Sequence, residues 1–326
     1  MTPTFSPLSN VPASQPVSAF ASSPGSSGRA AMAPRDFANR SIRPTVRIAG
    51  KVGEIAQGVD EGGAWLVSGA VTAGPFEGRA WAEPGVSFRL TSRDGSPKPK
   101  AEAAVREFLR LHGVDLEAAG HIHLETITLV GKGLGSSSVD SSLAIAVGAR
   151  ANGLVAHPRE MYSVLCSIER SDPVWLCDEL VFARPEAGMY EVWGPQPHFI
   201  LIAWDTTPGA MVDTADAANL DVHRRDHMAE YGEILAMIRT GDPGLILGAA
   251  TRSAALNDRY LPKPGFSWAR GLAESVGGGL ICCHSGTYLG VLLPPDSSPG
   301  LIGRVRSGVL EHGVQPDFFL MGGPNE

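Results

Sequence analysis

Apolar residues along this chain recur with two different spacings, one typical of strands and one typical of helices. Over residues 98–111, for example, Ala101, Val105, Phe108 and Leu109 fall on one face of a helix. Elsewhere, short runs of β-branched and apolar residues are punctuated by glycine, which favours strands. The pattern predicts strands over 46–55, 65–71, 86–90, 121–129, 199–204, 280–284 and 288–293, and further helices over 157–168, 223–239 and 245–257.

The order of these elements indicates the fold class. Strands and helices are mixed without a regular strand–helix–strand rhythm, so we predict an α+β fold rather than a doubly wound parallel sheet. Residues 1–40 are rich in Ser, Pro and Ala, contain one acid, Asp36, and show no sustained apolar period, so we predict a disordered tail there. Targeting or secretion segments share this composition, although a dispensable extension is the favoured interpretation. The length predicts two lobes after the tail.

Composition and charge narrow the classes of function. The formal net charge of −7 gives no general attraction to nucleic acid or anionic lipid, so we expect neither partner, whereas a small anionic ligand is compatible with a local site. No apolar run approaches the roughly 20 residues of a membrane span. Four cysteines without the spacing of a zinc knuckle fit a reducing cytoplasm. The sequence leaves the oligomeric state open.

A glycine-rich loop lies between a predicted strand and an apolar helical segment. Glycines let backbone N–H groups approach an anion closely, and the first turn of a helix offers unpaired donors and a positive dipole end, so the loop predicts a phosphate site. It is not a Walker A loop, because Gly-Lys-Ser/Thr is absent at the helix start. The loop comprises Gly131, Lys132, Gly133, Leu134, Gly135, Ser136, Ser137 and Ser138.

Hydroxyl and carboxylate groups accompany the loop. Among the three serines, we expect one hydroxyl to cap the helix and another to ligate Mg²⁺ or a phosphate oxygen. Glu169 and Asp172 lie just before Pro173, which marks a helix end because proline disfavours the α region in the residue before it. The two carboxylates can converge on one site, where one would bind Mg²⁺ and the other would lie near a substrate hydroxyl.

Four segments in family order resemble the motifs of the GHMP kinase superfamily. Residues 49–58 resemble its first motif, and residues 133–138 resemble its second, Gly-Leu-Gly-Ser-Ser followed by small residues. Residues 169–172 are similar to a Glu-Pro-Thr-Asp stretch, and residues 277–290 to the third motif, in the form seen in the L-threonine kinases of cobalamin biosynthesis. Asp140, in place of a common alanine, also matches that branch, which the chain resembles most.

The resemblance implies a two-lobed GHMP kinase fold, with an ATP-binding lobe over residues 41–195 and a second lobe over residues 196–326. It implies ATP and Mg²⁺ as cofactors and the phosphorylation of a small-molecule substrate, L-threonine, to O-phospho-L-threonine, which supplies the aminopropanol linker of cobalamin. The loop from Gly131 to Ser138 would bind the nucleotide.

The resemblance also assigns roles to side chains. Asp172 would be the catalytic base, and Ser137 and Glu169 would ligate the metal. Lys51 would neutralise charge that develops on the transferred phosphoryl group, a role that suits a flexible ammonium. The residues expected to hold the amino-acid substrate or a phosphate edge are Glu54, His284, Ser285 and Thr287.

Alternatives to a threonine kinase stay open. Lys51 favours a related kinase that acts on another hydroxylated amino acid, an amine or a sugar. From a different class, the tail suggests a catalytically inactive nucleotide-binding or interaction protein. A Ser/His/Asp hydrolase is not favoured, because His284 and Ser285 are neighbours in sequence and no Gly-x-Ser-x-Gly segment is present.

Overall fold

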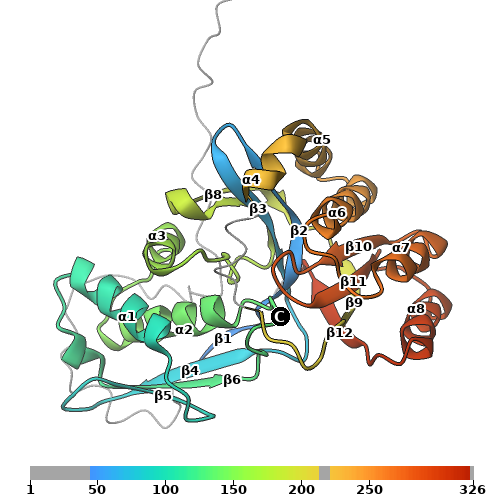
Figure 1. The fold of residues 1–326 in the computed structure, drawn as a ribbon. Helices are drawn as coiled ribbons and strands as arrows, with labels where there is room; N and C mark the ends of the chain where they lie inside the picture. The colour runs from blue at the N-terminus through green and yellow to red at the C-terminus, as the bar shows by residue number, and fades with distance from the viewer. Residues whose placement is uncertain (1–44, 213–220, 324–326) are drawn as a thin grey trace, which may run out of the picture.

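The computed structural model describes residues 45–212 and 221–323, and the tail predicted over residues 1–40 lies outside them. The described chain combines helices with two β-sheets, which confirms the predicted α+β class (Figure 1). None of the described helices is long and apolar enough to cross a membrane.

The smaller sheet has four strands in the order β1-β4-β6-β5. β5 runs parallel to β6, and the other pairs are antiparallel. Helices α1 and α2 cover one face of this sheet, so that its other face is turned downward in Figure 1. The elements are β1 (Val46–Ile48), β4 (Gly78–Glu83), β6 (His121–Thr126), β5 (Arg89–Ser92), α1 (Pro99–Leu111) and α2 (Ser136–Ala151).

The larger sheet has eight strands in the order β12-β9-β11-β10-β2-β3-β7-β8, and every pair in it is antiparallel. The two lobes were predicted to meet at residues 195 and 196, the end of β8, and this one sheet takes strands from both sides of that point. The strands are β12 (Asp317–Met321), β9 (Phe199–Asp205), β11 (Tyr288–Leu293), β10 (Gly279–Cys282), β2 (Lys51–Asp60), β3 (Gly63–Ala70), β7 (Glu179–Arg184) and β8 (Met189–Pro195).

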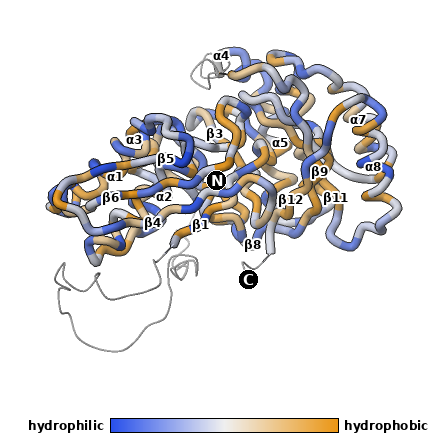
Figure 2. Tube along the Cα trace, turned by 90° about the horizontal axis from the view of Figure 1, so that it is seen from below, coloured by the Kyte–Doolittle hydropathy of each residue, from blue (hydrophilic) through white to orange (hydrophobic). Residues whose placement is uncertain are grey.

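Helices of the carboxyl-terminal half pack on the larger sheet and bury its apolar positions. α5 and α6 contact β2, and α7 contacts β11. Trp65 of β3 and Tyr231 of α5 meet edge to face with ring centroids 5.9 Å apart. Hydrophobic positions are concentrated along β9, β11 and β12 (Figure 2). The remaining helices and 3₁₀ turns are α3 (Pro158–Ile168), α4 (Asp221–Arg224), α5 (Met228–Arg239), α6 (Pro243–Asp258), α7 (Phe266–Ser275), α8 (Pro299–Glu311), η2 (Leu116–Ala119), η3 (Pro185–Ala187) and η5 (Arg225–His227).

Several predicted elements have different bounds in the structure. The strand predicted over 46–55 is two strands, separated at Gly50, whose φ of +83° breaks the extended backbone. The strand predicted over 86–90 begins only at Arg89, since Val86 is fully exposed. The helix predicted over 223–239 is divided among α4, η5 and α5.

Candidate active site

The glycine-rich loop enters α2 through glycines with left-handed backbone. Gly131, Gly133 and Gly135 have φ values of +71°, +82° and +73°, a region that side chains with a Cβ atom disfavour. No side chain in the described part of the chain caps the amino terminus of α2, so the prediction that a serine hydroxyl caps the helix is wrong. The first-turn N–H groups of this 16-residue helix therefore remain available to an anion.

The serine hydroxyls bond to the segment before Pro173 instead. Ser138 Oγ accepts a hydrogen bond from the backbone N–H of Asp172 at 3.3 Å. Ser137 Oγ donates to the carboxylate of Glu169. These two contacts bring both predicted carboxylates to the first turn of α2.

The loop packs backbone to backbone against the turn between β10 and β11. The N–H of Thr287 donates to the carbonyl oxygen of Lys132 at 3.1 Å. A Cβ atom at Gly286 would lie 2.0 Å from that oxygen, and one at Gly133 would lie 2.8 Å from the Cβ of Cys283. Glycine is therefore required on both sides of the contact, which places the second and third motifs side by side.

The side chains of Lys132 and Leu134 contact other parts of the chain. The Lys132 ammonium forms an ion pair with Asp205 at 2.6 Å and donates to the carbonyls of Thr207 and Pro208 at 3.0 and 2.9 Å. Leu134 is buried in the core of the larger sheet. Both residues thus contribute their backbone to the loop, whereas their side chains hold it in place.

A buried charged group links the first motif to the segment before Pro173. Lys51, at the start of β2, places its Nζ atom 2.7 Å from Oδ2 of Asp172, and the same ammonium donates to the carboxylate of Glu54. All three residues are less than a tenth exposed. One buried cation therefore lies between two buried carboxylates, which leaves the group with a net negative charge.

Burial and these charges shift the pKa values of the group. For Asp172, burial and the neighbouring Glu54 carboxylate raise the pKa, and attraction to Lys51 offsets only part of that effect. For Glu54, burial acts upward, but Lys51 and His284 outweigh it and hold the pKa well below the ordinary value. Burial lowers the pKa of Lys51, but the two carboxylates outweigh burial and the net pKa is raised, so this side chain stays charged. Asp172 is thus the stronger base of the two carboxylates.

His284 extends the group toward α6. Its Nδ1 atom and its backbone N–H lie 2.9 and 3.1 Å from Oε2 of Glu54, and its Nε2 atom lies 2.9 Å from Oγ of Ser253. Ser253 Oγ in turn accepts from the N–H of Gln57 at 3.2 Å. Burial lowers the pKa of His284, so the imidazole is neutral and donates from Nδ1 to the carboxylate.

No role was predicted for Ser253 from the sequence. No local pattern marks it, because it is a buried serine in an apolar helix and its partners lie on two other elements.

The remaining predicted substrate residues lie at the turn after β10. Ser285 is half-buried there, and Thr287 accepts at its carbonyl oxygen from the N–H of Thr206 at 3.0 Å. Neither is hydrogen-bonded to Lys51, Glu54 or Asp172 within the described residues. The structure therefore brings Thr287 to the loop through Lys132 and not to the buried charged group.

One acceptor in this group has no partner. Oδ1 of Asp172 is buried and makes no hydrogen bond to any part of the chain that the structure describes. A buried carboxylate oxygen without a donor is costly, so this atom is suited to receive a hydroxyl proton from a bound molecule.

The residues predicted to ligate magnesium offer the oxygen donors that this ion prefers. Ser137 and Glu169 lie in contact at the first turn of α2, beside the donors that suit a phosphate. Lys100, whose side chain is more than half exposed, forms an ion pair with the same Glu169 carboxylate. The donor set fits Mg²⁺, which would displace this surface ammonium.

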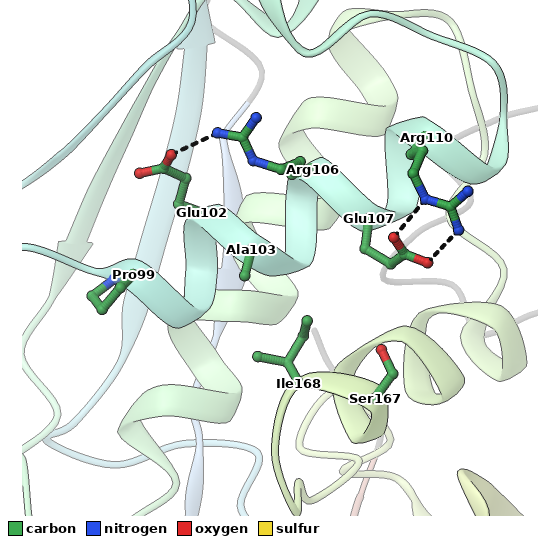
Figure 3. A pocket seen from close by; sticks show the side chains of 8 residues that line it. All are labelled: Pro99, Glu102, Ala103, Arg106, Glu107, Arg110, Ser167 and Ile168. Atoms are coloured by element: carbon green, nitrogen blue, oxygen red, sulfur yellow. Dashed lines mark hydrogen bonds and ion pairs between the residues drawn. The ribbon is translucent and has the colours of Figure 1, made fainter.

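A hollow of about 550 Å³ lies elsewhere, between α1 and the end of α3 (Figure 3). Its two arginines are paired within α1, Arg106 with Glu102 and Arg110 with Glu107, and Ser167 and Ile168 line the hollow from the end of α3. None of the lining residues belongs to the loop or to the buried charged group.

No protein-family model matches the sequence, and no curated protein sequence matches it. Solved structures do match. Homoserine kinase from Cytophaga hutchinsonii is 16% identical with a TM-score of 0.60, covering 86% of this chain and 96% of its own. Mevalonate kinase from Methanococcus jannaschii is 10% identical with a TM-score of 0.63, over 87% and 100%.

A third match has a nucleotide analogue bound. Streptococcus pneumoniae phosphomevalonate kinase in complex with phosphomevalonate and AMPPNP is 13% identical with a TM-score of 0.61, over 83% of this chain and 98% of its own. These matches extend over nearly the whole of each kinase. The fold of this chain is therefore that of the GHMP kinases.

Proposed function

We propose that this protein is an ATP-dependent kinase that phosphorylates the hydroxyl of free L-threonine, giving ADP and O-phospho-L-threonine for the aminopropanol linker of cobalamin. The observation that best supports the kinase reaction is the position of Asp172. Its Oδ1 atom is buried without a hydrogen-bond partner among the described residues, while its backbone N–H is bonded to the helix that follows the glycine-rich loop. The proposed base and the proposed phosphate site would thereby be held by the same turn of α2.

The nucleotide would bind with its phosphates at the loop. The left-handed glycines leave room for close approach, and the uncapped amino terminus of α2 supplies N–H donors and a positive dipole end. Ser137 and Glu169 would hold Mg²⁺, which shields the negative charge of the phosphates. Residues 41–195 would supply the loop and residues 196–326 would close over it.

Asp172 would orient the substrate hydroxyl and accept its proton as the oxygen bonds to the γ-phosphorus and the bond to the β-phosphate oxygen breaks. The upward shift of its pKa makes this carboxylate more basic than an ordinary aspartate. Lys51, 2.7 Å from the other carboxylate oxygen, stays charged and would offset the negative charge that develops nearby.

The choice of acceptor is supported by charge and by sequence. A free amino acid brings an ammonium group, and the net negative charge of Lys51, Glu54 and Asp172 favours a cation beside them. The first motif and the segment 169–172 resemble those of threonine kinases. Homoserine kinase, a structural neighbour, is named for an amino acid with a side-chain hydroxyl. We place the reaction in the cytoplasm, where the four free cysteines stay reduced.

A coupled ADP-release assay on the purified chain tests the proposal. With ATP and Mg²⁺, L-threonine should support ADP release well above the rate without acceptor, and the product should carry phosphorus on its side-chain oxygen by ³¹P NMR. Release with a sugar or an amine but not with L-threonine would overturn the acceptor and keep the kinase. Absence of release with every hydroxylated acceptor, despite ATP binding, would favour an inactive nucleotide-binding protein.

A further inference from the structure

Two histidines and a glutamate lie together on the face of the smaller sheet that α1 and α2 do not cover. His121 and His123 are two residues apart on β6, so their side chains project from the same face of the sheet. Glu83, at the end of β4, is paired directly with His121 in the antiparallel register. One potential ligand atom from each residue lies within 4.8 Å of the others.

The neighbouring side chains hold the two imidazoles in place. Oγ1 of Thr91, on β5, lies 3.1 Å from Nε2 of His121 and 3.3 Å from Nδ1 of His123. The indole of Trp81 stacks on the His123 ring, with centroids 4.9 Å apart. The rings are therefore confined by contacts from three strands, which lowers the entropy lost when they bind a ligand.

One nitrogen of this group lacks a hydrogen-bond partner. Nε2 of His123 is buried and makes no hydrogen bond within the part of the chain that is described, yet it lies 3.5 Å from Oε2 of Glu83. In the tautomer whose Nδ1 proton is donated to Thr91, the lone pair of His123 is on Nε2 and is available to a metal ion.

The spacing of these atoms suits a metal ion. Two ligands at about 2.0 Å from a tetrahedral Zn²⁺ ion lie roughly 3.3 Å apart, close to the separation of Nε2 of His123 and Oε2 of Glu83. Two imidazoles and one carboxylate suit Zn²⁺ better than Mg²⁺, which prefers oxygen donors. Arg89, opposite His121 on β5, brings positive charge to the same face, and the Glu83 carboxylate offsets it.

We propose that Glu83, His121 and His123 form a binding site for a divalent transition-metal ion, with Zn²⁺ as the favoured occupant and water in the remaining position. The metal would join β4 to β6 on the face opposite α2, the helix that follows the glycine-rich loop. The site is separate from the residues assigned to phosphoryl transfer, and it stands whether or not the kinase proposal does.

Calorimetric titration of the full chain with Zn²⁺, in excess Mg²⁺ to occupy sites made of oxygen donors, tests the proposal. The wild type should bind one Zn²⁺ with an affinity that falls at least about 100-fold in His123→Ala. His112→Ala is the matched control, since His112 contacts a single glutamate, Glu160, at 3.0 Å. Wild-type affinity in His123→Ala, or an equal loss in His112→Ala, would overturn the site.

A second measurement locates the metal, and it remains valid if His123→Ala folds poorly. Bound Co²⁺ should quench the fluorescence of Trp81, so Co²⁺ at stoichiometric concentration should quench the wild type and lose that quenching in Trp81→Phe. Glu83→Gln keeps the size of the side chain and removes only its charge, so it should also lower the Zn²⁺ affinity. Unchanged affinity in Glu83→Gln together with quenching retained in Trp81→Phe would contradict the site, whatever the stability of His123→Ala.

Discussion

The Nζ atom of Lys51 lies 2.7 Å from Oδ2 of Asp172, although 121 residues separate them in the chain. The first residue of β2 and the segment before Pro173 therefore meet in a buried contact that also includes Glu54. Since the other oxygen of Asp172 has no hydrogen-bond partner in residues 45–212 and 221–323, the ion pair fixes the carboxylate and leaves one acceptor for a ligand.

Asp172→Asn should lower kcat by about 10²–10⁴-fold while the affinity for ATP changes little, because a base acts on the hydroxyl in the transition state and not on bound nucleotide. Steady-state kinetics and a separate ATP titration measure the two effects. Asp296→Asn, at an exposed position, is the control and should match the wild type. A variant at residue 172 with wild-type kcat would show that the carboxylate is structural.

Gly135→Val should abolish ATP binding in a folded protein. Residue 135 has φ of +73°, and a Cβ atom there would lie 3.1 Å from Cγ of Lys51. Gly153→Val is the matched control, since its φ is +67° and a Cβ atom would meet nothing within 4 Å. Both variants carry about 1–2 kcal/mol of left-handed strain, so only a difference in ATP affinity between them reports on the loop. Equal ATP affinities in the two variants would show that the loop does not bind the nucleotide.

Glu169→Gln should raise the Mg²⁺ concentration needed for half-maximal activity by at least about 10-fold, because a ligand carboxylate loses its charge. Rates measured over a Mg²⁺ series at fixed ATP give this value. Glu102→Gln removes a glutamate that pairs with Arg106 on the surface of α1, and its Mg²⁺ requirement should not change. The same requirement in both variants would place the metal elsewhere.

The buried imidazole of His284 should make stability depend on pH. Its pKa is lowered in the folded protein, so as the pH falls below about 6.5 the unfolded chain binds a proton that the folded chain does not. The free energy of unfolding should therefore decrease toward pH 5, by up to about 1.4 kcal/mol per pH unit from this one group. Urea unfolding of His284→Asn should show a flatter profile, whereas the exposed control His157→Asn should keep the wild-type slope. Identical slopes in all three proteins would contradict this role.

If L-threonine is the acceptor, L-serine should be the poorer substrate by a modest factor of about 10–200, since one methyl group in a pocket contributes roughly 1–3 kcal/mol. Analogues without the ammonium or the carboxylate should lose far more, because each leaves a charged group of the site unpaired. Comparison of kcat/KM across these compounds measures the difference. Serine turned over as well as threonine would indicate that no pocket receives the methyl group.

Local sequence patterns predicted the parts of the fold that depend on local spacing. The helices over 98–111, 157–168 and 245–257 and the hairpin near 280–293 agree with the structure to within a few residues. β4 was missed, because its polar and apolar residues alternate only weakly, and β8 was missed because its side chains are largely exposed. α7 and α8 were also missed, since each buries only two residues and leaves little apolar signal.

The candidate site, too, could be predicted only where its residues are close together in the sequence. The loop and its helix are continuous in sequence and could be found from glycine and serine alone. The hydrogen bonds that join His284 to Glu54 and Ser253 could not be predicted from spacing, since they depend on how β2, α6 and the turn after β10 are arranged in space. The ion pair of Lys132 with Asp205 could not be predicted for the same reason. Lys132 was expected near the phosphate, whereas its side chain lies at the end of β9.

The central position of β2 has a consequence for biosynthesis. One edge of this strand pairs with β3, which follows directly, while the other edge pairs with β10. The hydrogen-bond partner of Glu54 at this edge, His284, lies 230 residues downstream. A nascent chain therefore leaves the ribosome with one edge of β2 unpaired and with Lys51 and Glu54 lacking their final environment. Until β10 has been translated, that open edge can join other strands, so folding of this chain should depend on rapid completion of synthesis or on a chaperone more than folding of a protein with local pairing.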